Sequence, residues 1–440
     1  MKALYTDLYQ LTMAAGYFEA GKTRERATFE MFVRRLPPNR KFLVAAGLAQ
    51  AVEYLQNLAF TGEDIDYLRT LGVFASVSPG YWEMLRAFRF TGDLFAVREG
   101  TPVFPGEPIL VVRAPIVEAQ IPETFLLSAV GFQTLIATKA ARIVEAAKGK
   151  SIVEFGTRRA HSPDAGVVAA RAAYIGGCIG TSNVEAGRRW QIPVFGTAAH
   201  SWVQSFSGEI TSYKLLQKLL GEATVYLIDT YDTIEGARRA AQLGKPLWGV
   251  RLDSGNLADL SKAVRKILDD AGLRDAKIMA SGDVNEYRLL ELAAAGAPID
   301  AFGVGTDLST SGDSPNLSAV YKLVEVEVHG IKRYTAKFSA DKNTLPGAKQ
   351  IFRYTDHDVV SCSWECPTDE PEALLRPVMT GGQVVEPLPS ASEARDHAAA
   401  SIAKLPVTCR MLSGHDSPWR VEYSPDLMKL LEQARRNVNV

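Results

Sequence analysis

Short polar segments in the middle of the chain follow apolar runs and hold the residues best suited to chemistry. In Arg251-Leu252-Asp253 a cation and a carboxylate lie two residues apart, so in a continuing strand they point the same way. The arginine of such a pair can bind a carboxylate or a phosphate, and the aspartate can bind ribose hydroxyls or magnesium. The alternative is an internal ion pair near the rim of a sheet, which needs no ligand.

Two glycine-containing turns have the composition of a phosphate site. Ser281-Gly282-Asp283 and Gly303-Val304-Gly305-Thr306 each follow a short apolar run. Bare backbone N–H groups and a hydroxyl in such turns can cradle phosphate oxygens. One glycine turn alone is weak support, but turns after consecutive late strands are the usual phosphate site of a β/α barrel.

Two further segments offer an acid and a nucleophile. In Asp229-Thr230-Tyr231-Asp232, the second acid is predicted to cap the following helix, which leaves Asp229 as the chemical candidate. His200 follows Gly196-Thr197-Ala198-Ala199 and precedes Ser201, a setting that suits a nucleophile, although an isolated histidine is usually structural. The other histidines have no comparable setting and are expected on the surface or in loops: His161, His329, His357, His397 and His415.

The segments that must position these residues alternate between strand and helix. Apolar runs predict strands at 152–155, 194–195, 225–228, 247–252, 277–280 and 301–304. Amphipathic patterns predict helices at 163–175, 232–243, 257–271 and 285–295. This alternation predicts a parallel sheet, and so many successive units favour a closed barrel. In a barrel the polar segments at the strand ends would meet on one face.

The flanking regions predict two further parts. Residues 1–150 are expected to form an α/β domain with helices at 6–20, 44–57, 63–71 and 79–87, a strand at 27–33, a small sheet at about 92–115 and a long helix at 122–148. Thr6 or Asp7 would cap the first helix. Residues 151–325 would form the barrel. Residues 326–440 are expected to be rich in strands and loops, to pack on the other domains, and to close with a helix at 425–435 capped by Ser424.

Composition narrows the class of protein. The 440 residues are 47% hydrophobic and carry a formal net charge of -1, which argues against nucleic-acid or membrane-surface binding through diffuse charge. We expect no signal peptide, because Asp7 follows Lys2 and no uninterrupted apolar h-region appears. We expect no membrane span, because no run reaches about 18 apolar residues. The 4 cysteines fit a reducing cytoplasm. Cys362, Cys366 and Cys409 could be three of four zinc ligands, but reduced structural thiols are the simpler interpretation.

Five ordered motifs resemble those of nicotinate phosphoribosyltransferases, and the resemblance runs from residue 4 to about 325. The motifs are Thr6-Asp7-Leu8-Tyr9-Gln10-Leu11-Thr12-Met13, Glu154-Phe155-Gly156-Thr157-Arg158-Arg159, Ala199-His200-Ser201, Asp229-Thr230-Tyr231-Asp232 and Arg251-Leu252-Asp253-Ser254-Gly255. The resemblance implies an irregular β/α (TIM-like) barrel beside an α/β sheet domain formed by N-terminal and C-terminal segments.

The resemblance also implies the reaction and its participants. Nicotinate, phosphoribosyl pyrophosphate, ATP and water would give nicotinate mononucleotide, pyrophosphate, ADP and phosphate, the first step of NAD synthesis from nicotinate. ATP and magnesium would be required. A homodimer would share its active sites.

Each motif then acquires an implied role. Phe155 would stack on the pyridine ring, and Tyr9 of a second subunit would close the sandwich. Arg158 would meet the pyrophosphate, while Arg251, Asp229 and Asp253 would hold substrate and ribose. The turns at 281–283 and 303–306 would receive the 5′-phosphate, and His200 would carry the phosphoryl group. Thr181, Ser182 and Ser201 complete the expected substrate-binding set.

One departure and three alternatives accompany the resemblance. The family's usual acid after the Ser-Gly of the Arg251 motif is Asn256 here, which puts a magnesium or water contact in doubt. The nicotinamide-using relative carries an acid where this chain has Ser182, and an acid suits an amide and repels a carboxylate. Quinolinate phosphoribosyltransferase uses no phosphohistidine and is usually shorter. An inactive metabolite sensor on the same barrel is a more distant alternative.

Overall fold

The computed structural model describes residues 3–339, 342–413 and 419–438. Its chain divides into two compact units. Unit 1 combines Met1–Leu135, Asn316–Pro389 and Ala400–Val440, and unit 2 combines Ile136–Pro315 and Ser390–Ala399. The C-terminal region therefore contributes to both units, and the domain limits expected near residues 150 and 325 stay predictions.

Unit 1 is built on a 7-stranded sheet in the order β13-β12-β1-β5-β3-β17-β18. Strands from the two ends of the chain alternate in it: β1 (Arg26–Val33), β3 (Asp93–Ala96), β5 (Pro108–Pro115), β12 (Ala319–Val328), β13 (Ile331–Tyr334), β17 (Arg376–Thr380) and β18 (Gln383–Val384). The central strand β1 pairs antiparallel with both β5 and β12. This sheet joins N-terminal and C-terminal segments, as the sequence analysis expected.

Smaller elements complete unit 1. A 4-stranded sheet has the order β16-β14-β15-β19, and a 2-stranded sheet pairs β2 with β4. Their bounds are β2 (Leu43–Val44), β4 (Pro102–Val103), β14 (Lys349–Arg353), β15 (His357–Cys362), β16 (Glu372–Ala373) and β19 (Arg420–Tyr423). The helices are α1 (Leu8–Glu19), α2 (Leu48–Asn57), α3 (Gly62–Arg69), α4 (Pro79–Ala87), α5 (Ile116–Gln120), α16 (Val407–Arg410) and α17 (Pro425–Val438).

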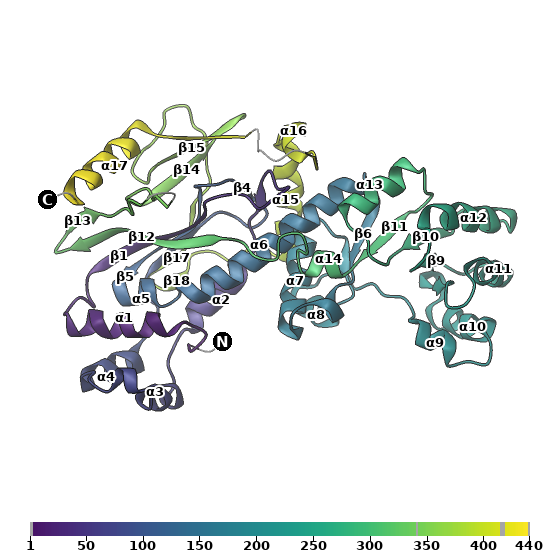
Figure 1. Ribbon diagram of the computed structural model, residues 1–440, viewed down its shortest axis with the longest axis horizontal. Coiled ribbons are helices and arrows are strands. Elements are labelled where there is room, and N and C mark those ends of the chain that lie inside the picture. Colours follow the sequence, from purple (N-terminus) through teal and green to yellow (C-terminus); the bar gives the residue numbers. More distant parts are fainter. Residues whose placement is uncertain (1–2, 340–341, 414–418, 439–440) are drawn as a thin grey trace. The chain divides into compact units, whose positions relative to one another are not determined.

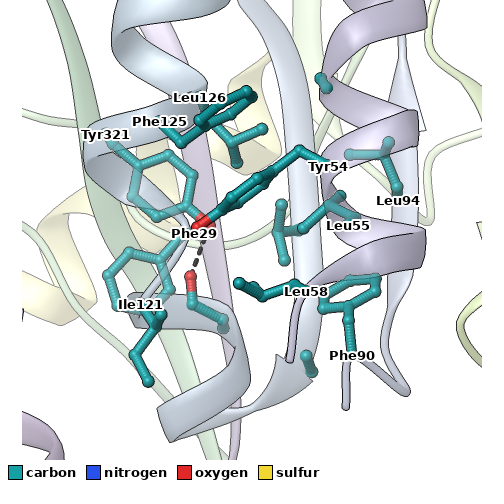
Figure 2. Close-up of a cluster of buried hydrophobic side chains, with 14 of the residues drawn as sticks. Phe29, Tyr54, Leu55, Leu58, Phe90, Leu94, Ile121, Phe125, Leu126 and Tyr321 are labelled. Atoms are coloured by element: carbon teal, nitrogen blue, oxygen red, sulfur yellow. Dashed lines mark hydrogen bonds between the residues drawn. The ribbon is translucent and has the colours of Figure 1, made fainter. Parts of the chain in front are cut away.

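The core of unit 1 contains stacked aromatic side chains from distant parts of the chain (Figure 2). Tyr54 of α2 stacks on Phe125 with ring centres 3.8 Å apart, and Phe29 of β1 stacks on Tyr321 of β12 at 5.0 Å. The Tyr321 hydroxyl donates a hydrogen bond of 2.6 Å to the Ala119 carbonyl oxygen. Stacked rings of this kind bury large apolar areas, so one pair joins α2 to the start of α6 (Glu123–Ala146) and the other joins the N-terminal strand β1 to the C-terminal strand β12.

Unit 2 is built on a 6-stranded parallel sheet in the order β7-β6-β11-β10-β9-β8. Its strands are β6 (Ser151–Glu154), β7 (Gly180–Thr181), β8 (Val225–Leu227), β9 (Gly249–Leu252), β10 (Lys277–Ala280) and β11 (Ala301–Val304). Helices follow these strands, as Figure 1 shows for α11 (Thr233–Leu243), α12 (Leu257–Asp270) and α13 (Glu286–Ala294). Two helices have residues in both units, α6 (Glu123–Ala146) and α15 (Ala391–Lys404). The remaining helices of unit 2 are α7 (Pro163–Ile175), α8 (Val184–Trp190), α9 (His200–Gln204), α10 (Glu209–Leu220) and α14 (Thr306–Ser309).

One cavity adjoins the sheet of unit 2. It has a volume of about 380 Å³ and is lined by side chains from β6, β8, β10 and β11 and by residues 194–197. Val153, Met279 and Ala301 form a buried apolar cluster at its wall. The edge strands β7 and β8 do not pair with each other in the described part of the chain. The parallel α/β sheet is therefore confirmed, and its closure into a barrel stays a prediction.

Local predictions can be compared with the elements found. Asp232 and Ser424 cap α11 and α17 with side-chain hydrogen bonds of 2.8 and 3.2 Å. Asp7 occupies the cap position of α1 but makes no capping bond, because its carboxylate accepts a hydrogen bond from Thr124 instead. The strand expected at 194–195 is reduced to one bridge between Thr181 and Val194. The short strand β7 and the long helix α15 were not predicted.

The burial of the histidines other than His200 can be compared with expectation, as can that of the cysteines. His161 and His329 are exposed, as expected, but His357 begins β15 and His397 lies in α15, both half-buried. His415 lies outside the described residues. Cys178, Cys362 and Cys409 are buried, and Cys366 is exposed. Within the described ranges, no three His, Cys, Asp or Glu side chains gather closely enough to hold a metal ion. The structure thus gives the zinc alternative no support.

One helical stretch, Ile116–Ala146, is long and apolar enough to cross a membrane by length and composition alone. Its most apolar window is 67% buried inside the protein. A helix that is mostly buried inside the protein is typical of a protein core. The stretch includes α6, which we therefore describe as a core helix.

Candidate active site

Arg251 is the centre of a hydrogen-bond network at the carboxyl end of β9. Its Nε donates to Ser281 Oγ at 2.7 Å, its Nη1 to Thr197 Oγ1 at 2.7 Å and its Nη2 to Asp253 Oδ1 at 2.6 Å. Its guanidinium carbon lies 5.8 Å from the centre of the Phe155 ring. The Arg251–Asp253 pair therefore forms, and the network holds a permanent positive charge next to an aromatic face.

Asp253 links Arg251 to His200. Its Oδ1 accepts hydrogen bonds from Arg251 and from the Ser281 hydroxyl, and its Oδ2 lies 3.7 Å from His200 Nε2. Burial alone would raise the pKa of Asp253. The Ser281 hydrogen bond and the Arg251 charge outweigh burial, so the pKa is lowered. Asp253 is therefore a carboxylate at neutral pH and can accept further hydrogen bonds.

Asp229 follows β8 and has one free carboxylate oxygen. Its Oδ2 accepts hydrogen bonds from the Asp253 backbone N–H at 2.8 Å and from Ser254 Oγ at 2.7 Å. Its Oδ1 is buried and has no hydrogen-bond partner among the residues that the structure describes. An unsatisfied buried oxygen costs about 1–3 kcal/mol, so this atom is suited to a ligand hydroxyl or a cation.

His200 is held from two sides at the first residue of α9. Its Nδ1 lies 3.2 Å from Thr230 Oγ1, and its Nε2 faces Asp253. The imidazole remains 41% exposed, so a reactant can approach it. Ser201, the next residue, is exposed. The geometry thus connects the predicted nucleophile to the Arg251 network through Asp253.

Buried Glu154 organises the end of β6. It accepts a hydrogen bond of 2.5 Å from Thr181 Oγ1 and another from the Gly156 backbone N–H. Burial raises the pKa of Glu154 above its usual value. The Ser182 backbone N–H donates to the Glu154 carbonyl oxygen at 2.9 Å, and the Phe155 N–H donates to Val304 O at 2.8 Å. Phe155 and Ser182 are both half-buried, and their backbones are fixed by neighbouring strands.

Close backbone approach explains two of the glycines. Gly282 has a φ of +85°, and a Cβ there would lie 2.1 Å from the Asp253 carbonyl oxygen. A Cβ on Gly303 would lie 2.4 Å from the Phe155 ring. Any larger residue would displace the Asp253 segment or Phe155. These glycines therefore have structural roles whether or not the turns bind phosphate.

The remaining predicted residues lie at the periphery. Arg158 is exposed in the 3₁₀ turn Thr157–Arg159, and Asp283 and Thr306 are exposed after β10 and β11. Gly305 precedes α14. Tyr9 belongs to unit 1, where it is 46% exposed on α1.

Asn256, the departure from the family pattern, caps α12. It accepts a hydrogen bond from the Asp259 backbone N–H at 3.4 Å, and its side-chain amide donates to the Asp259 carboxylate at 2.6 Å. An aspartate could not make the second bond.

Sequence reasoning missed three hydroxyl groups that complete the site. Thr197 accepts from Arg251, Thr230 contacts His200, and Ser254 donates to Asp229. Thr230 and Ser254 lie next to the candidate residues Asp229 and Asp253, and Thr197 lies three residues before His200, so proximity in sequence was the available signal. Their partners lie 25 to 54 residues away in the sequence, so only the fold identifies the contacts.

Comparisons with known proteins agree with these motifs. Residues 4–131 match the nicotinate phosphoribosyltransferase (NAPRTase) N-terminal domain, and residues 150–344 match the nicotinate phosphoribosyltransferase (NAPRTase) family. A nicotinate phosphoribosyltransferase of Mycobacterium tuberculosis is 43% identical over 98% of this chain and 94% of its own length. The Bacillus subtilis enzyme of that name is 48% identical over 80% of this chain and 73% of its own length.

Solved structures are also similar. The crystal structure of human nicotinic acid phosphoribosyltransferase superposes with a TM-score of 0.84 at 30% identity, covering 97% of this chain and 99% of the human chain. A nicotinate-nucleotide pyrophosphorylase from Pyrococcus furiosus gives 0.73 at 28% identity, covering 91% and 94% of the two chains. With its ordered motifs, both domain matches and similarity along almost its whole length, this chain belongs to the nicotinate phosphoribosyltransferase family.

Proposed function

We propose that this protein joins nicotinate to phosphoribosyl pyrophosphate, giving nicotinate mononucleotide and pyrophosphate, and couples this reaction to ATP hydrolysis through phosphorylated His200. The observation that carries the proposal is the contact chain from Arg251 through Asp253 to His200. It brings a cation, a ribose-binding acid and a nucleophile to one edge of a parallel sheet. Family membership supports the same reaction.

Transfer of the ribose requires alignment and charge stabilisation more than covalent chemistry. As the bond to pyrophosphate breaks, positive charge develops on the ribose and negative charge on the leaving group. Asp229 Oδ1 and the Asp253 carboxylate would accept hydrogen bonds from ribose hydroxyls, and exposed Arg158 would meet the pyrophosphate. Phe155 would hold the flat pyridine ring for attack by its nitrogen.

Magnesium fits this site as a partner of the substrate phosphates. Mg²⁺ is commonly held by one or two carboxylates together with phosphate oxygens, so a cluster of three protein ligands is not required. The unpartnered Oδ1 of Asp229 supplies a suitable hard oxygen. A bound magnesium ion would neutralise charge on the departing pyrophosphate.

Phosphoryl transfer to His200 would supply the coupling. An unprotonated ring nitrogen attacks the γ-phosphorus of ATP, the new P–N bond forms, and the P–O bond to ADP breaks. Water later attacks the phosphorus, the P–N bond breaks, and phosphate leaves with the imidazole restored. While it lasts, the phosphate adds negative charge and acceptor oxygens beside Asp253 and can favour a tightly binding state.

Ser182 suits nicotinate as the pyridine substrate. It is half-buried beside Thr181 and brings no negative charge against a carboxylate, while Arg251 supplies the positive charge. An acid at this position would favour an amide and repel a carboxylate. We therefore propose nicotinate over nicotinamide.

A homodimer with shared sites would complete the pocket. Leu8, Tyr9 and Met13 are exposed apolar side chains on α1, with exposures of 51%, 46% and 42%. Tyr9 and Met13 are four residues apart and therefore lie on the same side of the helix, where a second subunit could cover them. We propose that Tyr9 of one subunit closes over the pyridine of the other, and that the closed barrel and a cytoplasmic location of the family apply here.

A parallel product assay tests the proposed function. The purified protein is given phosphoribosyl pyrophosphate with nicotinate, nicotinamide or quinolinate, each with and without ATP, and the nucleotide product is identified by mass. We expect nicotinate mononucleotide only, with ATP increasing its yield. Equal or higher specificity for nicotinamide or quinolinate would reject the proposed substrate, and absence of any product would favour a metabolite sensor.

A further inference from the structure

A buried lysine lies behind the candidate phosphate turns. Lys139 of α6 has a fully buried side chain, and its Nζ lies 2.7 Å from Glu286 Oε2, 2.7 Å from Asp307 Oδ2 and 3.0 Å from Asp313 Oδ1. All four residues belong to unit 2. None of them was assigned a role above, and the proposed reaction does not use them directly.

Two acids of this cluster lie just after the two candidate phosphate turns in the sequence. Glu286 is the first residue of α13, just after the turn at 281–283, and Asp307 directly follows Thr306 of the turn at 303–306. One ammonium group therefore contacts the segments that follow both turns. Because Lys139 is anchored in a long helix, it links the two turns to a common rigid element.

The charges make this link strong and sensitive to substitution. Arg142 Nε contacts Glu286 Oε1 at 3.1 Å, so two cations face three acids in the cluster. Burial favours the neutral amine, but Glu286 and Asp307 outweigh it, and the pKa of Lys139 is raised. Removing one partner of a buried ion pair leaves an uncompensated charge and destabilises its surroundings strongly. Loss of the ammonium would push the acids, and the turns attached to them, apart.

We propose that Lys139 is a positioning residue that sets the spacing of the turns at 281–283 and 303–306, and thereby the affinity for the 5′-phosphate of phosphoribosyl pyrophosphate. This inference rests on the proposed function and deepens it. Lys139 does not touch the ligand. Its effect passes through Asp307 and Glu286, and misplacement of binding groups by about 1 Å can cost about 100-fold in rate.

Substitution of Lys139 tests the proposal. Lys139→Met keeps the length of the side chain and removes its charge, and Asp307→Asn cuts only the link to the second turn. We expect KM for phosphoribosyl pyrophosphate to rise about 10-fold in Lys139→Met and by a smaller factor in Asp307→Asn, with KM for nicotinate unchanged. The matched control is Arg265→Met, which removes a part-buried cation that bonds the Leu273 and Ala276 carbonyl oxygens in the same unit. It should lower Tm without changing either KM.

Binding of ribose 5-phosphate, measured by calorimetry, separates this inference from the proposed function. Wild-type binding with weaker binding in both variants supports Lys139 as a positioning residue even if no nucleotide is made. The proposed role of Lys139 would be overturned if the wild type is active and both variants keep two properties within twofold of it. These properties are KM for phosphoribosyl pyrophosphate and the affinity for ribose 5-phosphate. If Lys139→Met does not fold, the same measurements on Asp307→Asn alone support or overturn the proposal.

Discussion

Arg251 donates to three different side chains, and this arrangement depends on the planar guanidinium. Lysine offers a point charge on a flexible stem and cannot reach Ser281, Thr197 and Asp253 together. Each hydrogen bond to a charged group contributes about 1.5–3 kcal/mol, so losing two should cost about 100-fold or more in kcat/KM.

Steady-state kinetics of Arg251→Lys measure this loss. Thr197→Val, which removes only one acceptor, should cost less. Near-wild-type kinetics in Arg251→Lys would mean that catalysis does not need the three hydrogen bonds that the guanidinium donates.

Substrate choice is predicted to depend on Ser182. Ser182→Asp places a negative charge near the pyridine substituent, which repels the carboxylate of nicotinate and accepts hydrogen bonds from the amide of nicotinamide. The ratio of kcat/KM values for nicotinate and nicotinamide should shift toward nicotinamide by about 10-fold or more, with a loss of rate. Ser182→Asn is the uncharged control of similar size. An unchanged ratio in Ser182→Asp would show that Ser182 lies away from the bound ring.

For individual residues, the sequence predicted the charged side chains of the candidate site better than the hydroxyl side chains that contact them. Arg251, Asp253 and Asp229 could be predicted because charged residues at or just after the ends of recognisable apolar strands are seldom needed for the core. Thr197 and Thr230 could not, because each contacts a residue far along the chain, 54 residues away for Thr197 and 30 residues away for Thr230. Hydroxyl residues also occur at many strand ends for local reasons, so their type alone did not distinguish them.

Secondary-structure elements were predictable where their pattern was regular. The strands β6, β8, β9, β10 and β11 are short apolar runs between amphipathic helices, and all were expected. Strand β7 covers only Gly180–Thr181, which is too short to show a period. Helix α15 contains alanine and polar residues in similar number and has no clear apolar stripe, so its sequence pattern did not predict a helix.

A buried acid pair beside β5 should make the stability of unit 1 depend on pH. Burial and the neighbouring Asp358 carboxylate hold the pKa of Glu107 well above its usual value. Asp358 is itself paired with Arg353 at 2.6 Å, and Arg353 lies over Phe104 and Trp419. A raised acid pKa means that the folded state binds the proton more tightly, so stability is full below the unfolded pKa of about 4.3 and is lost as pH rises through the folded value.

Glu107→Gln removes this titration while keeping the shape of the side chain. We expect its Tm to exceed that of the wild type by about 2–4 °C at pH 8 and the difference to shrink toward pH 5. Thermal unfolding across this pH range measures the effect, with Glu327→Gln on the half-buried end of β12 as a control. A difference that grows as pH falls would contradict the assigned sign.

For the whole molecule, the shared-site dimer predicts complementation between inactive chains. Tyr9→Ala removes the side chain that is proposed to complete the active site of the other subunit. Arg158→Ala removes a side chain that is proposed to act in the active site of its own subunit. Mixed dimers would hold one intact site, so activity should return to about a quarter of the wild-type value after subunit exchange at equal concentrations, because half of the dimers are mixed and half of their sites are intact. No recovery, with exchange confirmed by a mass-tagged chain, would argue against a shared site.

The central claim is that His200 couples ATP hydrolysis to nucleotide formation, and one measurement tests it directly. ADP and nicotinate mononucleotide are quantified together in wild type and His200→Ala, with γ-labelled ATP used to locate the phosphoryl group by acid lability and peptide mapping. We expect acid-labile label on His200 in the wild type. His200→Ala should show no nicotinate-dependent ATPase and a slow transfer that ATP does not stimulate, because alignment and charge at Arg251, Asp229 and Asp253 remain. Label on Ser201, or full ATP stimulation in His200→Ala, would contradict this account.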